Sequence, residues 1–170
     1  LRGTPVYEVV DLLLDIDIFR RLRLRAQARG TDGIADLITA LRLVDGRPFD
    51  YAVEREAASG WAWLIDGDRI DQHIKAAIVD VAHIITTHAL ANGDLPTARM
   101  AAETAALAVS SEEIPHLDLA AVATAEGNHA EASHIFRDQI SNRTDDENPP
   151  PEVPTRTNQI LRQRHRRRAS

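Results

Sequence analysis

The chain has 170 residues, of which 44% are hydrophobic and 27% are charged, a composition typical of one ordinary globular domain. This composition excludes a fibrous or wholly disordered protein, and no uninterrupted apolar run reaches the roughly 18 residues that a membrane span requires. Cysteine is absent, which excludes disulfides, thiolate metal sites and thiol nucleophiles and predicts a cytoplasmic protein. The net charge is −6 although residues 156–170 hold six arginines and no acid, so overall charge gives no support for DNA binding.

The N-terminal third predicts a strand followed by two helices. Residues 7–19 are rich in β-branched and apolar residues and end with Ile16 and Ile18 between aspartates, which predicts the close of a strand. Asp17 can cap a first helix that runs through residue 28 and is ended by Gly30. A second helix should start at Asp32 and end before a break at residues 45–48. Its apolar stripe consists of Leu37, Leu41 and Val44.

Four further helices are predicted after a long loop. Trp61 and Trp63 are expected to anchor the core just before a long helix over residues 68–91. The apolar stripe of that helix consists of Ile70, Ile74, Ile78, Val81, Ile85 and His88. Caps then mark the starts of three helices: Asp94, the pair Ser110 and Glu113, and the pair Asn128 and Glu131. Beyond residue 142 we expect an acidic, proline-rich linker and a basic tail.

A pattern of turn and packing residues repeats after 34 positions. Gly93-Asp94 followed by Ala98 recurs as Gly127-Asn128 followed by Ala132. Glycine permits the tight turn, Asp or Asn caps the second helix, and alanine lets the two helices approach closely. An alanine-rich chain produces the alanine part of the pattern by chance, but the whole pattern at the period of a tetratricopeptide (TPR) hairpin predicts an all-α, TPR-like stack of helical hairpins.

Three stretches together with these hairpins resemble a known family. They are Ile16-Asp17-Ile18-Phe19-Arg20-Arg21-Leu22, the pattern Leu-x-x-Ala-Leu-Arg-Leu-Val-x-Gly over residues 37–46 followed by Arg47-Pro48-Phe49, and Trp61-x-Trp63. Over residues 7–142 the chain is similar to the bacterial transcriptional activator domain of actinobacterial regulators of the SARP type. A related arrangement places such a module in large proteins that carry a peptidoglycan-binding LysM domain.

The resemblance implies an organisation in three parts. Residues 1–15 would be the remnant of the last strand of a winged helix, residues 16–142 a helical domain, and residues 143–170 the linker and tail. Because the chain starts at Leu1 without a methionine or signal peptide, we expect it to be a fragment whose upstream part is missing. The resemblance implies that this upstream part is a DNA-binding domain. The implied function is non-catalytic regulation of transcription through a protein partner, a neighbouring domain or self-association, and the alternative is a module of a LysM protein.

Aligning the two hairpins on their glycines points to a partner-binding groove. The candidate residues occupy positions that resemble the groove-lining ones of TPR modules: Asp80, His83, Ile84, Thr87, Leu117, Asp118, Ala121 and Thr124. Polar side chains on apolar helices need hydrogen-bonding partners, which a bound segment could supply. Contact with the loop or the C-terminal segment of the same chain, or a hydrogen bond along one helix, would satisfy them equally well.

Other chemistry finds little support in the sequence. The histidine pairs 83/88 and 129/134 are five residues apart and lack ligand spacing, so we expect no metal and no cofactor. An enzyme would depend only on Asp80 and His83 as an acid–base pair, and we expect none. A rival hypothesis is an accessory DNA contact through an arginine-rich first helix and the tail, whose candidates are Arg162, Arg164, Arg166, Arg167 and Arg168.

Overall fold

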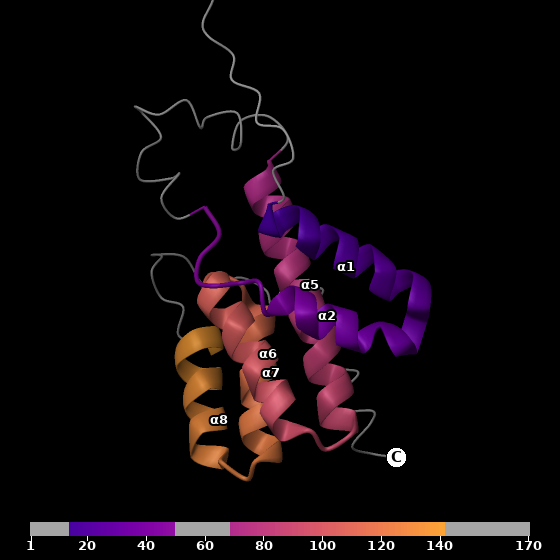
Figure 1. Cartoon of the computed structure of the whole chain (residues 1–170). Coiled ribbons are helices and arrows are strands. Elements are labelled where there is room, and N and C mark those ends of the chain that lie inside the picture. The colour runs from indigo at the N-terminus through magenta and orange to yellow at the C-terminus, as the bar shows by residue number, and fades with distance from the viewer. Residues whose placement is uncertain (1–13, 50–68, 142–170) are drawn as a thin grey trace, which may run out of the picture.

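All regular structure in residues 14–49 and 69–141, the part of the chain that the computed structural model describes, is helical. In Figure 1 α1 and α2 lie at one end of the molecule and α8 lies at the other. The helices are α1 (Asp15–Arg29), α2 (Ile34–Leu41), α5 (Ile70–Ala91), α6 (Leu95–Ala108), α7 (Glu113–Ala125) and α8 (His129–Ile135). A 3-10 turn, Gly30–Gly33, joins α1 to α2, and a π-helical turn, Phe136–Ser141, extends α8. The predicted all-α fold is confirmed for these residues.

The first helix begins earlier than the sequence predicted. Residues 15–19 form the first turns of α1, so the strand predicted to end at Phe19 is wrong over this part, and Asp17 is not a cap. Two acids in the first turn favour a helix N-terminus, and Phe19 is only 4% exposed because it faces the core. The rest of the predicted winged-helix remnant, residues 1–13, lies outside the described residues.

The connection from α1 to α2 depends on two glycines. Gly30 has a φ of 60° and ends α1, as predicted. Gly33 packs so closely on α1 that a Cβ there would lie 2.3 Å from the carbonyl oxygen of Ala26. The 3-10 turn therefore takes the place of the helix start predicted at Asp32, and α2 ends at Leu41 rather than near Val44.

Two helical hairpins follow, α5–α6 and α7–α8, and their turns have the same geometry. Gly93 and Gly127 have φ angles of 72° and 81°. In the first turn the amide of residue 94 donates to the carbonyl of residue 89 at 2.9 Å, and the equivalent bond from residue 128 to residue 123 is 2.8 Å. Asp94 and Asn128 then cap α6 and α8 as predicted, each accepting a backbone N–H at 3.2 Å. The architecture is therefore repeat-like, with a period of 34 residues.

The central helix α5 packs on α2, α6 and α7. By length and composition alone α5 could cross a membrane, but half of its most apolar window is buried inside the fold, as in the core helix of a globular protein. The predicted stripe is buried from Ile74 to Ile85, whereas Ile70 is half-buried and His88 is exposed at the end of the helix. Ala98 is fully buried beside Ala89, Ala102 and Val122, and Ala132 is half-buried.

The start of α7 also differs from its prediction. The capping box of Ser110 and Glu113 does not form, because α7 begins only at Glu113 and residues 109–112 are used to cross from α6 to α7. The hydroxyl of Ser110 instead accepts a hydrogen bond from Arg47 at 3.3 Å, and its carbonyl contacts the ring Nε2 of His116 at 3.1 Å. Trp61 and Trp63 lie outside the described residues.

Candidate functional site

Four polar side chains join α5 to α1 and to α7. Arg23 on α1 places a guanidinium nitrogen 3.6 Å from a carboxylate oxygen of Asp80 on α5. One turn further along α5, Nδ1 of His83 lies 3.0 and 2.9 Å from the two carboxylate oxygens of Asp118 on α7. We call Arg23, Asp80, His83 and Asp118 the polar row. It links α1 to α5 and α5 to α7.

The contact between His83 and Asp118 is the most buried part of the polar row. Asp118 is 1% exposed, whereas the side chain of His83 is 25% exposed. When Nδ1 of His83 carries the ring proton, it donates to the carboxylate of Asp118. Because a buried carboxylate without donors would be costly, His83 supplies part of what Asp118 needs. The contact therefore fixes α7 against α5.

The predicted groove residues fall into an inner group and an outer group. Leu117 and Asp118 are 2% and 1% exposed, so their side chains pack inside the fold and offer almost no surface to a bound segment. Ile84, by contrast, is 49% exposed on α5. The others are half-buried: Asp80, His83, Thr87, Ala121 and Thr124. The hydroxyl of Thr124 donates to the carbonyl of Ala120 at 2.7 Å.

The polar row supplies partners from within the fold for some of the polar side chains of the predicted groove. Asp80 and His83 do lie on one face of α5, as predicted, but each contacts a different neighbouring helix. A bound segment is therefore not needed to supply the partners of this face. For proton transfer, His83 is held by Asp118 rather than by Asp80, so the acid–base pair suggested by the sequence is not the pair that the fold brings together.

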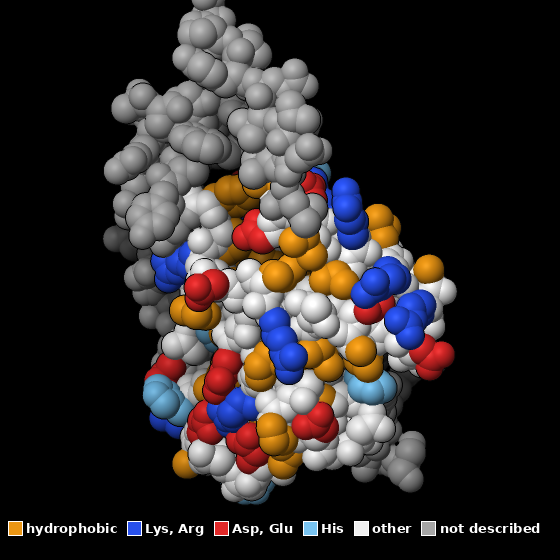
Figure 2. Space-filling view, viewed as in Figure 1, with side chains coloured by type: hydrophobic (Ala, Val, Ile, Leu, Met, Phe, Trp, Pro, Cys, Tyr) orange, Lys and Arg blue, Asp and Glu red, His pale blue; other side chains and the backbone are white. Residues whose placement is uncertain are grey.

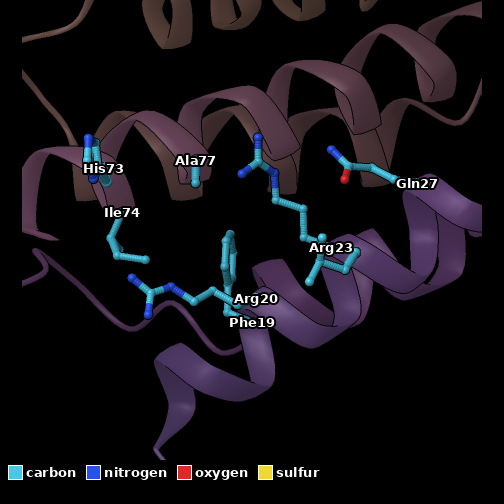
Figure 3. Close-up of a pocket in the computed structure, with 8 residues that line it drawn as sticks. Phe19, Arg20, Arg23, Gln27, His73, Ile74 and Ala77 are labelled. Carbon is cyan, nitrogen blue, oxygen red and sulfur yellow. The ribbon is translucent and has the colours of Figure 1, made fainter.

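A hollow of about 230 Å³ lies between α1 and α5, beside the polar row (Figure 3). Its lining includes Arg23 from the polar row and does not include Asp80, His83 or Asp118. The lining residues are Phe19, Arg20, Arg23, Leu24, Gln27, His73, Ile74 and Ala77. The sequence singled out Phe19 and the arginines of α1, but nothing in their spacing indicated that α5 would close a hollow over them.

Two clusters of ion pairs escaped the sequence analysis. Asp36 on α2 is 6% exposed and is bound by Arg25 through bonds of 2.6 and 2.8 Å. The hydrogen bonds from Arg25 hold the pKa of Asp36 below its ordinary value. At the other end of the stack Arg99 on α6 binds three carboxylates, those of Glu103, Glu126 and Glu131. Only the pair of residues 99 and 103, which are four apart on one helix, left a signal in the sequence.

The electrostatics of the Arg99 cluster follow from this geometry. The hydrogen bonds to Glu126 and then to Glu131 raise the pKa of Arg99, and the guanidinium lowers the pKa of Glu126. Since Glu131 also accepts from the side chain of Asn128 at 2.9 Å, the same carboxylate serves both the ion-pair cluster and the start of α8. These contacts tie α6 to the second hairpin, and the charged groups in them are engaged with one another.

Metal and nucleic-acid sites complete the survey. Within residues 14–49 and 69–141 no group of three or more potential metal-ligating side chains comes together. The arginine candidates between Arg162 and Arg168 lie outside the described residues.

No family model matches the chain, and no curated protein or solved structure shows significant similarity to it.

Proposed function

We propose that this chain is a non-catalytic, TPR-like interaction module, and that it serves a cytoplasmic bacterial transcriptional regulator by binding a protein partner or a second copy of itself beside a DNA-binding domain. The observation that carries this proposal is the pair of matched hairpins, α5–α6 and α7–α8, with the first helix of one packed on the first helix of the other. Stacks of helical repeats present extended concave surfaces that bind partners.

The side chains on α5 support an interaction face with a defined centre. Ile84 is 49% exposed and lies four residues after Asp80 and three before Thr87, so the three share one face of the helix. An apolar side chain with a polar rim is the usual anatomy of an interface centre. Because the polar row holds α5 against α1 and α7, Ile84 is presented from a rigid helix, which reduces the entropy lost on binding.

The test compares one substitution on this face with the same change elsewhere. Ile84→Glu places a charge at the proposed centre, and Leu107→Glu is the matched control, because Leu107 is 62% exposed on α6, the second helix of the same hairpin. Sedimentation measures self-association of the chain, and calorimetry measures binding of the proposed DNA-binding domain. We expect Ile84→Glu to weaken whichever association occurs by at least about tenfold and Leu107→Glu to leave it unchanged.

The result that would contradict the proposal is equally specific. Both substituted side chains are exposed, so circular dichroism should show unchanged helicity and thermal stability for both variants. If neither association is detected, or if the two variants bind as tightly as the unsubstituted chain, the face around Ile84 is not an interaction site.

A further inference from the structure

The hollow between α1 and α5 combines an apolar floor with a cationic rim. Phe19, Ile74 and Ala77 are largely buried and form the floor, while Leu24 is 65% exposed at the edge. The polar members of the lining are Arg20, Arg23, Gln27 and His73. Figure 3 shows Phe19 and the two arginines rising from α1, with His73, Ile74 and Ala77 opposite them on α5.

The cations around the hollow are not equally engaged. Helix α1 carries five arginines against two aspartates, and Figure 2 shows basic side chains gathered over this helix. Arg25 and Arg29 bind Asp36, and Arg23 lies near Asp80. Among the described residues Arg20 has no ion-pair partner, although it stands at the rim. The hollow therefore has positive charge to offer to a ligand.

We propose that this hollow docks an acidic peptide segment of a partner protein, which inserts one leucine-sized side chain between α1 and α5 and places a carboxylate against Arg20. The apolar floor has no use for a phosphate group, and the buried ring of Phe19 is not available to stack on a base, which argues against a nucleic acid. An apolar pocket with an arginine at its edge is a common composition of a binding hot spot once a partner covers it. Charge complementarity selects an acidic flank.

This inference deepens the proposed function, because it names the chemistry of a partner, and it rests on the chain being an interaction module. The hollow and Ile84 lie along one face of α5, since residues 73, 77, 80 and 84 follow one another at helical spacing. It depends, however, on α1, which the experiment at Ile84 does not touch. The two proposals can therefore fail separately.

The test uses the full chain and fluorescence anisotropy with a labelled peptide that has one leucine between glutamates. Control peptides replace the leucine by serine or the glutamates by lysines, and a labelled DNA duplex serves as the nucleic-acid probe. Arg20→Glu is compared with Arg21→Glu, because both side chains are exposed neighbours on α1 but only Arg20 lines the hollow. Leu24→Ser is compared with Leu107→Ser, at 65% and 62% exposure.

We expect saturable binding of the acidic peptide that is weakened about tenfold by Arg20→Glu and by Leu24→Ser, and changed less than about twofold by the two controls. Both control peptides should bind at least about tenfold more weakly. The proposal is overturned if the peptide shows no saturation at about 1 mM chain. Equal losses in Arg20→Glu and Arg21→Glu overturn it too, as does a duplex that binds more tightly than the peptide, since that would indicate a phosphate-binding surface.

The outcomes at the two surfaces separate the two proposals. If the acidic peptide fails to bind while Ile84→Glu disrupts the association measured by sedimentation or calorimetry, only the docking inference is refuted. If the peptide binds as expected and Ile84→Glu has no effect, the hollow rather than the face around Ile84 is the interaction site.

Discussion

Replacing Ala98 by leucine tests whether alanine sets the distance between α5 and α6. Ala98 is 0% exposed and is packed with Ala89, Ala102 and Val122. Leucine adds three carbon atoms, which would contribute about 2.4 kcal/mol if the site could bury them without strain, at about 0.8 kcal/mol each. A tightly packed site gives the opposite sign, because forced rotamers and backbone shifts typically produce a net loss of about 1–3 kcal/mol.

We expect the strain to dominate, so that Ala98→Leu lowers the free energy of unfolding by about 2 kcal/mol. At about 4 °C per kcal/mol for a domain of this size, Tm should fall by roughly 8 °C. Urea denaturation followed by circular dichroism measures the change directly. Ala106→Leu on the same helix is the control: Ala106 is half-buried, so its added atoms extend toward solvent and the change should stay within about 0.5 kcal/mol. An Ala98→Leu protein as stable as the unsubstituted chain, or more so, would refute close packing by alanine.

Three further predictions concern the polar contacts. Because its pKa is lowered from 3.8, the carboxylate of Asp36 stabilises the fold above that pH and ceases to do so as the pH falls through the folded-state pKa. Asp36→Asn should therefore be less stable than the unsubstituted chain at pH 7, with a gap that closes in acid denaturation below pH 3.8; a gap independent of pH would contradict the ion pair with Arg25. Asn128→Ala removes the cap of α8 and should cost about 1 kcal/mol in urea denaturation, whereas Asn128→Ser keeps a capping oxygen and should retain most of this stability; equal losses would mean that the cap is not the cause. Arg99→Gln should cost about 1 kcal/mol at low salt and clearly less in 1 M salt, and a loss insensitive to salt would point to packing instead.

The parts of the fold that the sequence predicted are those decided by short-range chemistry. Gly93 with Asp94 and Gly127 with Asn128 each determine a turn within a few residues, and the structure repeats that turn after 34 positions. The long helix α5 could also be predicted from the sequence, because its apolar stripe extends over many turns. The start of α1 could not be predicted, since an alternation of only Ile16 and Ile18 fits a helix as well as a strand.

Only the part of the candidate site that lies along a single helix was predicted from the sequence. Asp80 and His83 were placed on one face from their spacing along α5, but the pairing of His83 with Asp118 depends on how α5 and α7 cross. The repeat misleads at this point: a shift of 34 residues relates Ile84 to Asp118, yet the first is 49% exposed and the second is 1% exposed. Equivalent positions in a repeat share a backbone geometry, whereas burial depends on what lies next to each helix.

The two kinds of contact between the helices have different consequences for the interaction face. Alanine packing between α5 and α6 limits the distance between helices, but small side chains of similar shape do not by themselves determine which residues face each other. The contact between His83 and Asp118 favours one register, because a shift of α7 by one turn would take the buried Asp118 away from His83. We infer that this contact helps to set the register of the second hairpin on the first, alongside the bonds from Arg99 to Glu126 and Glu131. The rigid presentation of Ile84, on which partner binding is proposed to depend, then follows in part from contacts that the partner never needs to touch.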